Sequence, residues 1–476
     1  MADQQYEMGM IGLGVMGRNF ALNIRDHGFG VAGYDRDAEK VAALRLESGG
    51  ENTRGADTLA EMVALLRKPR AVMLLVPAGP PVDAVIQALL PLLAPGDLIV
   101  DGGNSHYRDT DLRQATLAER GLAFMGVGVS GGSEGARRGP SLMPGGPPEA
   151  YERIRKILEA TAAQAAGEPC VAYLGPGSAG HYVKMVHNGI EYGFLQLIAE
   201  TYDLMKRGLG MNNDELHAVY RGWAAAELES YLVEITADIF REVDAQTGLP
   251  LIDRILDEAR QKGTGKWASE DAMELQVPMP TIDSAVAARN LSMYKGTRLA
   301  IHGVMELPLR KFSGDRAWFL DRLRSGLYAA LILTYAQGMD QLRAASTTCG
   351  YGFDLETVAR IWRGGCIIRS ALLEPIRRAY ARKPALENLL LDPGIGGEVL
   401  TRHDDLRGVV CEAAGLGIPA PALMASLGYL DSFRSEWLPA SLIQAQRDYF
   451  GAHSYERIDE KGVFHTEWVG SEDDHD

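Results

Sequence analysis

The chain has 476 residues, which is enough for two or three domains with a sizeable core. Its 48 lysine and arginine residues against 63 aspartate and glutamate residues give a net charge of −15, which argues against general nucleic-acid binding and against binding to anionic membranes. The four cysteines form no disulfide framework or Cys/His cluster, and neither a signal peptide nor a membrane-spanning run is visible, so we expect a cytoplasmic protein without a metal site.

The first apolar segment carries a dinucleotide-binding pattern. The strand-like Met8-Gly-Met-Ile runs into Gly12-Leu13-Gly14-Val15-Met16-Gly17, and a helix-like segment follows from Arg18 to His27. In such a pattern the first glycine permits a tight turn, the second lets the backbone approach a pyrophosphate, and the third allows close helix–strand packing. Alone this pattern is weak, but a second strand ends at Asp35, 18 positions after Gly17, where the fingerprint requires an acidic residue. We therefore predict a nucleotide site.

Strand-like and helix-like segments alternate through the first part of the chain, which predicts a parallel sheet with crossover helices. Further strands are expected at 71–76, 98–101, 122–127 and 170–174, and helices at 57–66, 82–93, 109–120 and 148–163. Ligands bind in loops at the carboxyl ends of such strands. Two loops there are rich in glycine and polar residues: Asp101 to Ser105, which contains Asn104, and Ser130 to Gly146, which begins Ser130-Gly131-Gly132.

A glycine-rich stretch at 175–180 marks a domain boundary. Beyond it helical periodicity dominates to about residue 450. We therefore divide the chain into a dinucleotide-binding domain at 1–177, an all-helical domain at 178–440 and a C-terminal tail at 441–476.

The helical segment 180–192 combines apolar and reactive side chains. At about 100° per residue, Lys184 and Glu191 point the same way two turns apart, and His187 and Asn188 flank the line between them. The other positions are apolar nearly all round, which favours a buried helix whose polar stripe faces a cleft. Such a stripe offers one potential base and one potential acid. The alternative is a partly exposed helix with a solvated polar stripe.

Six motifs, taken together, resemble the family of decarboxylating 6-phosphogluconate dehydrogenases. They are GLGVMGRNFALNIRDHGF, DGGNS, GVSGGSEGARRGPSLMPGG, KMVHNGIEYG, QKGTGKW and QAQRDYFGAH, in family order over essentially the whole chain, although the carboxyl tail looks short. A general Rossmann dehydrogenase would share only the first. The resemblance implies a Rossmann-type α/β coenzyme domain, a large all-α domain and a short C-terminal tail that reaches the partner subunit of a homodimer.

The resemblance also implies a reaction: oxidative decarboxylation of 6-phospho-D-gluconate to D-ribulose 5-phosphate and CO2, in the pentose phosphate pathway and without a metal. Lys184 would act as general base on the C3 hydroxyl while hydride leaves C3 for the nicotinamide. Glu191 would then protonate C1 of the enediol. A neutral Lys184 requires a lowered pKa, and we predict that burial or nearby positive charge lowers it.

The same resemblance assigns binding roles. Around the sugar acid's carboxylate and hydroxyls it places Asn104, Ser130, Gly131, Gly132, His187 and Asn188. Around the phosphate end it places Tyr192, Lys262, Arg289, Arg447 and His453, of which Arg447 and His453 would come from the other subunit. Arginine suits phosphate because its planar fork of donors matches phosphate geometry.

The coenzyme segment departs from the family pattern. Most members carry Asn-Arg-Thr or Asn-Arg-Ser where this chain has Asp35-Arg36-Asp37, and Val-Lys-Ala where it has Val76-Pro77-Ala78. Arg36 can still meet a 2′-phosphate or stack on adenine. Asp35, however, is placed to accept hydrogen bonds from an unphosphorylated ribose, and two carboxylates would repel a 2′-phosphate. The family favours NADP, whereas the local charges favour NAD or dual use, and we expect a slight preference for NAD. Asn104 also belongs to the expected coenzyme set.

Two other interpretations remain. Another β-hydroxyacid dehydrogenase, such as one acting on 3-hydroxyisobutyrate, would share the glycine loop and the lysine but would not need Lys262, Arg289, Arg447 and His453. A catalytically silent metabolite-binding protein on the same scaffold would not need both Lys184 and Glu191.

Overall fold

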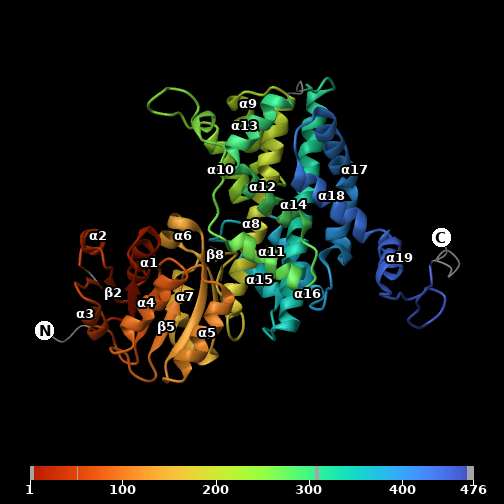
Figure 1. Ribbon diagram of the computed structural model, residues 1–476. Helices are drawn as coiled ribbons and strands as arrows, with labels where there is room; N and C mark the ends of the chain where they lie inside the picture. The colour runs from red at the N-terminus through yellow and green to blue at the C-terminus, as the bar shows by residue number, and fades with distance from the viewer. Residues whose placement is uncertain (1–4, 51, 306–309, 469–476) are drawn as a thin grey trace. The chain divides into compact units, whose positions relative to one another are not determined.

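A computed structural model describes residues 5–50, 52–305 and 310–468 of the chain. The first part contains a seven-stranded sheet in which every neighbouring pair is parallel except the last, β6–β7 (Figure 1). In spatial order the strands are β3 (Thr53–Gly55), β2 (Val31–Tyr34), β1 (Met8–Ile11), β4 (Ala71–Leu74), β5 (Leu98–Asp101), β6 (Ala123–Ser130) and β7 (Ser141–Gly145).

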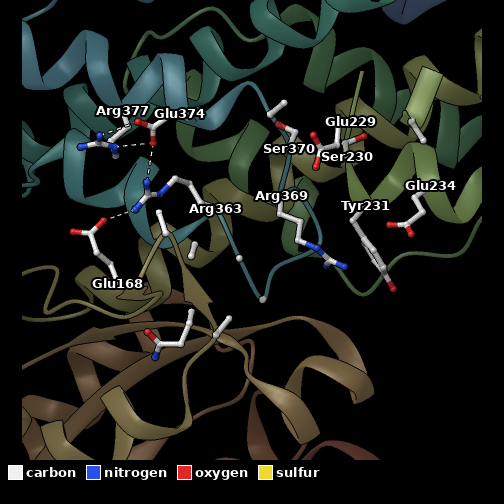
Figure 2. Close-up of a pocket in the computed structure, with 18 of the residues that line it drawn as sticks. Glu168, Glu229, Ser230, Tyr231, Glu234, Arg363, Arg369, Ser370, Glu374 and Arg377 are labelled. Atoms are coloured by element: carbon white, nitrogen blue, oxygen red, sulfur yellow. Dashed lines mark hydrogen bonds and ion pairs between the residues drawn. The ribbon is translucent and has the colours of Figure 1, made fainter. Parts of the chain in front are cut away.

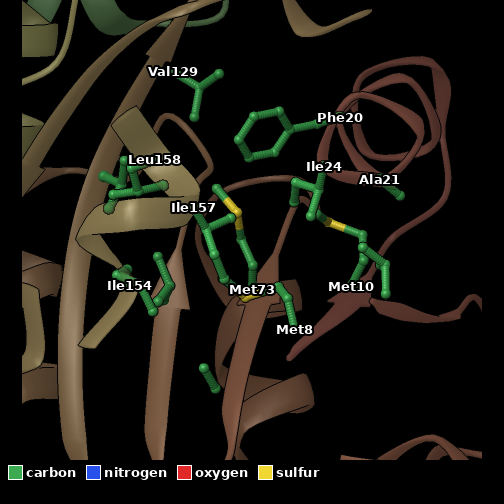
Figure 3. Close-up of a cluster of buried hydrophobic side chains, with 14 of the residues drawn as sticks. Met8, Met10, Phe20, Ala21, Ile24, Met73, Val129, Ile154, Ile157 and Leu158 are labelled. Atoms are coloured by element: carbon green, nitrogen blue, oxygen red, sulfur yellow. The ribbon is translucent and has the colours of Figure 1, made fainter. Parts of the chain in front are cut away.

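Helices cover both faces of this sheet, so its central strands are apolar on both sides. Figure 3 shows one face, where Met8 and Met10 of β1 pack with Phe20 of the first helix and Ile154 of the seventh. The helices of this domain are α1 (Val15–Asp26), α2 (Ala38–Ser48), α3 (Leu59–Ala64), α4 (Pro80–Leu89), α5 (Tyr107–Ala118), α6 (Gly132–Arg138) and α7 (Pro148–Thr161). A hairpin of β8 (Gln164–Ala165) and β9 (Glu168–Pro169) follows.

The strand predicted at 170–174 is wrong. Only Val171 of that segment makes a sheet bridge, to Leu142, and the edge position of the sheet belongs to β7 instead. β7 was not predicted, because its residues lie within the glycine- and proline-rich stretch that reads as a loop. It forms a strand because it turns back antiparallel along β6, so pairing overrides local propensity.

The second part is helical, and α8 and α14 run side by side through it (Figure 1). This confirms the predicted fold class of a Rossmann-type domain followed by a large all-α domain. Its helices are α8 (Ala179–Asp203), α9 (Asn213–Ala224), α10 (Tyr231–Ile239), α11 (Thr264–Glu274), α12 (Pro280–Ser292), α13 (Lys295–Val304), α14 (Arg316–Thr348), α15 (Leu355–Ile361), α16 (Leu373–Arg382), α17 (Pro393–Leu416), α18 (Pro421–Phe433) and α19 (Ala440–Gly451). Short helical turns are η1 (Leu204–Gly208), η2 (Leu251–Arg254) and η3 (Leu389–Leu391).

Two glycines, Gly128 and Gly180, allow α8 to pack closely against the sheet. A Cβ added to Gly128 of β6 would lie 2.5 Å from Cβ of Lys184, and one added to Gly180 would lie 2.4 Å from the Gly126 carbonyl oxygen. Any larger side chain would therefore push the helix away from β6. The close approach places Lys184 beside the carboxyl end of β6, which finishes at Ser130.

The chain separates into two compact units, residues 1–427 and 428–476. The second unit contains α19 and a short segment folded around the fully buried carboxylate of Asp448. That carboxylate accepts four hydrogen bonds: from the backbone of Ser454 and Thr466, from the His465 ring and from the Trp468 indole, at 2.8 to 3.0 Å.

Within the described parts of the chain, none of the helices has the length and apolar character to cross a membrane.

Candidate active site

The glycine loop after β1 has the geometry of a dinucleotide turn. Gly12 has φ +93°, and a Cβ there would lie 2.5 Å from the Leu75 carbonyl oxygen. A Cβ on Gly17 would lie 1.8 Å from the Gly12 oxygen, so only glycine lets α1 start this close to the strand. By contrast, the space around Gly14, which caps α1, is open. The loop and the free N–H groups at the start of α1 therefore fit a pyrophosphate.

The carboxylate of Asp35 is turned toward this loop. Its Oδ2 accepts the backbone N–H of Leu13 at 2.7 Å, and its Oδ1 accepts the N–H of Asp37 at 3.0 Å. The Asp37 side chain is more exposed, caps α2 through the N–H of Glu39, and lies 3.5 Å from Nζ of Lys40. Asp35 thus braces the glycine loop, while Asp37 carries the accessible negative charge at the expected ribose position. Arg36 is exposed beside it, and Val76, Pro77 and Ala78 follow the end of β4.

Polar side chains that project from α8 lie close together, as the sequence pattern predicts. Nζ of Lys184 donates to Oδ1 of Asn188 at 2.7 Å and lies 3.3 Å from Nδ1 of His187. The other ring nitrogen of His187 is 3.2 Å from Oγ of Ser130, which connects the cluster to the end of β6. Oε2 of Glu191 lies 4.0 Å from Nδ1 of His187. Lys184, His187 and Asn188 are all buried, so the alternative of a solvated stripe is wrong.

Burial sets the protonation of this cluster. It lowers the pKa of Lys184 below its usual value, although the Glu191 carboxylate acts in the opposite direction, so the predicted lowering is confirmed in direction and cause. Burial likewise raises the pKa of Glu191, against the charges of Lys184 and Arg289. The pKa of His187 falls well below its usual value because of burial and the nearby Lys184 charge. Burial therefore shifts each of these three groups toward its neutral form.

The residues expected at the phosphate end lie partly together. The Arg289 guanidinium lies over the Tyr192 ring, 3.5 Å from its centroid. The start of α11 packs on the same ring, since a Cβ on Gly265 would lie 2.3 Å from it. Lys262 is exposed two residues before α11. Arg447 and His453 belong to the second unit, at α19 and just after it.

The loops that follow β5 and β6 contribute the remaining expected residues. Asn104 is exposed after β5, and Gly131 and Gly132 follow Ser130 at the start of α6. The sequence pattern placed Asp101 in this loop but predicted no role for it. Its carboxylate accepts the Gly103 N–H at 3.0 Å and the Ser105 hydroxyl at 2.6 Å, and so it shapes the Asn104 loop. An aspartate directly before Gly-Gly-Asn is a turn signal that could have identified it.

A separate hollow of about 1180 Å³ lies beside the β8–β9 hairpin, and Figure 2 shows Arg363 there, bonded to both Glu168 and Glu374. None of the expected catalytic, coenzyme or substrate residues lines it. Among the described residues, no group of three or more histidine, cysteine, aspartate or glutamate side chains could hold a metal ion.

The structure thus combines a dinucleotide fold with a buried lysine, Lys184, on a long helix that packs on the sheet. Two family models match the chain: the NAD binding domain of 6-phosphogluconate dehydrogenase over residues 7–175, and the C-terminal domain of 6-phosphogluconate dehydrogenase over residues 180–468.

Full-length relatives agree with these matches. The chain is 53% identical over 472 residues to a decarboxylating 6-phosphogluconate dehydrogenase of Synechococcus elongatus, which covers 98% of this chain and 100% of the relative. It is 49% identical over 470 residues to an NADP(+)-dependent decarboxylating 6-phosphogluconate dehydrogenase of Bacillus subtilis, with the same coverage. A solved 6-phosphogluconate dehydrogenase of Plasmodium falciparum, studied in its apo form and with NADP+ and 6-phosphogluconate, superposes with a TM-score of 0.93 at 43% identity, covering 97% of this chain and 100% of that one.

The chain therefore belongs to the 6-phosphogluconate dehydrogenase family, and it is an oxidoreductase. The family assignment reached from the motifs is confirmed, and the alternatives of a different β-hydroxyacid dehydrogenase or a silent binding protein are set aside.

Proposed function

We propose that this chain oxidatively decarboxylates 6-phospho-D-gluconate to D-ribulose 5-phosphate and CO2. The observation that carries the proposal is the pairing of Lys184 with Glu191 on one buried helix, beside Ser130 at the end of β6. Burial lowers the pKa of Lys184 and raises the pKa of Glu191, so the two values move toward each other. A protein that only binds this sugar acid needs no such acid–base pair.

Lys184 is the proposed general base. As a neutral amine it takes the proton of the C3 hydroxyl, and as an ammonium it returns a proton to that oxygen when negative charge gathers there. Its hydrogen bond to Asn188 fixes the direction of the amine, and the neutral His187 adds no competing charge. The bound nicotinamide coenzyme supplies the acceptor for the hydride that leaves C3.

Glu191 is the proposed general acid. The C3 ketone makes the C1 carboxylate a leaving group, because the carbonyl accepts the electron pair released with CO2. The enediol that remains needs a proton on the carbon that lost CO2. Burial keeps the Glu191 carboxyl protonated to higher pH than usual, so it can supply that proton.

The expected binding residues complete the proposal. Asn104, Ser130, Gly131, Gly132, His187 and Asn188 hold the carboxylate and hydroxyls, and Tyr192, Lys262 and Arg289 hold the phosphate end. Arg447 and His453 reach the site of the partner in a homodimer, through the tail at 441–476 that follows the coenzyme domain (1–177) and the helical domain (178–440). The reaction uses no metal, and we place the enzyme in the cytoplasm.

The coenzyme is proposed to be NAD or NADP, with a slight preference for NAD. The loop from Gly12 to Gly17 holds the pyrophosphate. The Asp35 side chain is only 9% exposed, whereas that of Asp37 is 43% exposed, so the repulsion of a 2′-phosphate comes mainly from Asp37. Lys40, 3.5 Å from Asp37, offsets part of that charge, which supports dual use.

The test is the initial rate of coenzyme reduction with 6-phosphogluconate, with NAD and NADP compared in one preparation and CO2 release measured alongside. Turnover that releases one CO2 for each coenzyme reduced is expected with both coenzymes. Absence of turnover with either coenzyme would refute the function. A higher efficiency with NADP than with NAD would refute only the coenzyme preference.

A further inference from the structure

The buried carboxylate of Asp271, on α11, joins three other elements. Its Oδ1 accepts the hydroxyl of Tyr107 at 2.8 Å, and its Oδ2 accepts the hydroxyl of Tyr182 and the amide of Gln341, the latter at 3.0 Å. Tyr107 begins α5 of the coenzyme domain, Tyr182 lies on α8 and Gln341 on α14. Asp271 is only 6% exposed, so these hydrogen bonds replace the water that a carboxylate requires.

Contacts along α8 and α11 define an antiparallel pair. Gly265 near the start of α11 meets the Tyr192 ring, Ala268 lies 2.9 Å from a Cβ placed on Gly189, and Asp271 meets Tyr182. The first two contacts are close and apolar, and they set how near the two helices lie to each other. A hydrogen bond is directional, so the Tyr182–Asp271 bond adds a constraint on the axial register of α11 on α8.

The helix α11 also packs against the coenzyme domain, at the start of α5. Trp267, Asp271 and Glu274 follow helical spacing and share one face of α11. They meet three consecutive residues at the start of α5: the His106 ring lies 4.9 Å from the Trp267 ring, Tyr107 bonds to Asp271, and Arg108 pairs with Glu274. Of these contacts, only the one through Asp271 is buried.

Three of these four joined helices carry or adjoin expected substrate residues. α5 starts directly after the Asn104 loop, α8 carries Lys184, and Lys262 lies two residues before α11. The geometry points to Asp271 as a positioning residue that fixes the register of α11 on α8 and thereby the reach of Lys262 toward a phosphorylated substrate held at Lys184. This inference rests on the proposed function, because it takes the substrate to be a sugar acid phosphate.

The test is the Asp271→Asn variant, which keeps the side-chain volume but turns an NH2 group toward tyrosine donors. Calorimetric titration of 6-phosphogluconate into the enzyme without coenzyme should give a dissociation constant about tenfold weaker than wild type, and KM should rise equally. The kcat should stay within about threefold, and coenzyme affinity should not change. Tyr182→Phe, which removes one donor without leaving a cavity, should cause a smaller loss in the same direction.

Asp111→Asn is the matched control. The Asp111 carboxylate accepts both the N–H and the hydroxyl of Ser178 at 2.8 Å, so it joins α5 to α8 without contacting α11. Its substrate affinity should remain that of wild type. The inference is overturned if Asp271→Asn and Tyr182→Phe lower the melting temperature but leave substrate affinity unchanged. It is also overturned if these variants weaken the affinity for 6-phosphogluconate and the affinity for the coenzyme by the same factor. Failure of the wild-type enzyme to turn over 6-phosphogluconate is a separate result, which refutes the proposed function and this inference with it.

Discussion

The proposed coenzyme end of the site is built from backbone and exposed charge, whereas the proposed acid–base end is built mainly from buried side chains. At the first, Gly12 and Gly17 leave no room for a Cβ, and the more accessible charge belongs to Asp37. At the second, burial itself moves the pKa values of Lys184 and Glu191. Substitutions at the coenzyme end should therefore change affinity, and those at the acid–base end should change turnover.

The largest effect is expected at Lys184. Lys184→Met removes the proposed base and fills a similar space, so turnover should fall about a thousandfold or more. Coenzyme affinity, measured by fluorescence titration, should stay at the wild-type value because the loop after β1 is untouched. A kcat within tenfold of wild type would show that another group is the base.

Gly17→Ala should produce the opposite pattern. The new Cβ would lie 1.8 Å from the Gly12 oxygen, so the loop must move. We expect coenzyme affinity about a hundredfold weaker and a lower melting temperature, measured by titration and thermal unfolding.

Gly14→Ala is the control for that variant, because its Cβ would point into open space. Its melting temperature should match wild type, and only coenzyme binding should weaken. Unchanged stability and coenzyme affinity in Gly17→Ala would remove the steric argument for this loop.

Glu191→Gln should affect a later step than Lys184→Met. The amide cannot donate the proton that the enediol needs, so overall turnover should fall about thirtyfold. Rapid-mixing measurements should still show the first reduction of coenzyme at near the wild-type rate, with product formation delayed. An equal slowing of both phases would assign Glu191 to the first step instead.

The pH profile tests the burial argument directly. Only neutral Lys184 can accept a proton, and burial lowers its pKa from the usual 10.5, so the active form persists to lower pH. The kcat/KM for 6-phosphogluconate should be level above the lowered pKa and fall about tenfold per pH unit below it. A profile with no ionisation below the ordinary lysine range would contradict this.

The smallest effect is expected at Asp37. Asp37→Ser removes the more accessible of the two carboxylates near Lys40, which then faces only Asp35 at 3.9 Å, so the ratio of kcat/KM for NADP to that for NAD should rise about fivefold. Asp35→Asn should change this ratio less, since the amide oxygen can still accept the Leu13 N–H. An unchanged ratio in both variants would mean that neither carboxylate selects the coenzyme.

Local patterns predicted much of this molecule. The glycine fingerprint, the order of the two folds and the polar stripe from Lys184 to Glu191 follow from spacing, because turn geometry and helical periodicity are properties of short segments. The family motifs then carried the assignment of activity.

What could not be predicted depends on contacts between distant segments. β7 forms only because β6 lies beside it, and the 170–174 segment loses its place in the sheet for that reason. The turn of Asp35 toward Leu13 and the meeting of Asp271 with Tyr182 likewise join residues whose proximity exists only in the folded chain. Charge and residue type alone gave no sign of either.

The four hydrogen bonds gathered by Asp448 have a consequence for assembly. Ordering a free chain costs about 1–2 kcal/mol per residue, a cost that a disordered tail would meet on binding its partner. In a tail already folded around Asp448, this loss of conformational entropy occurs when the subunit itself folds. Arg447 and His453, next to this carboxylate and its Ser454 contact, are then presented as a preorganised pair, so the proposed dimer can form with less entropy lost at the moment of association.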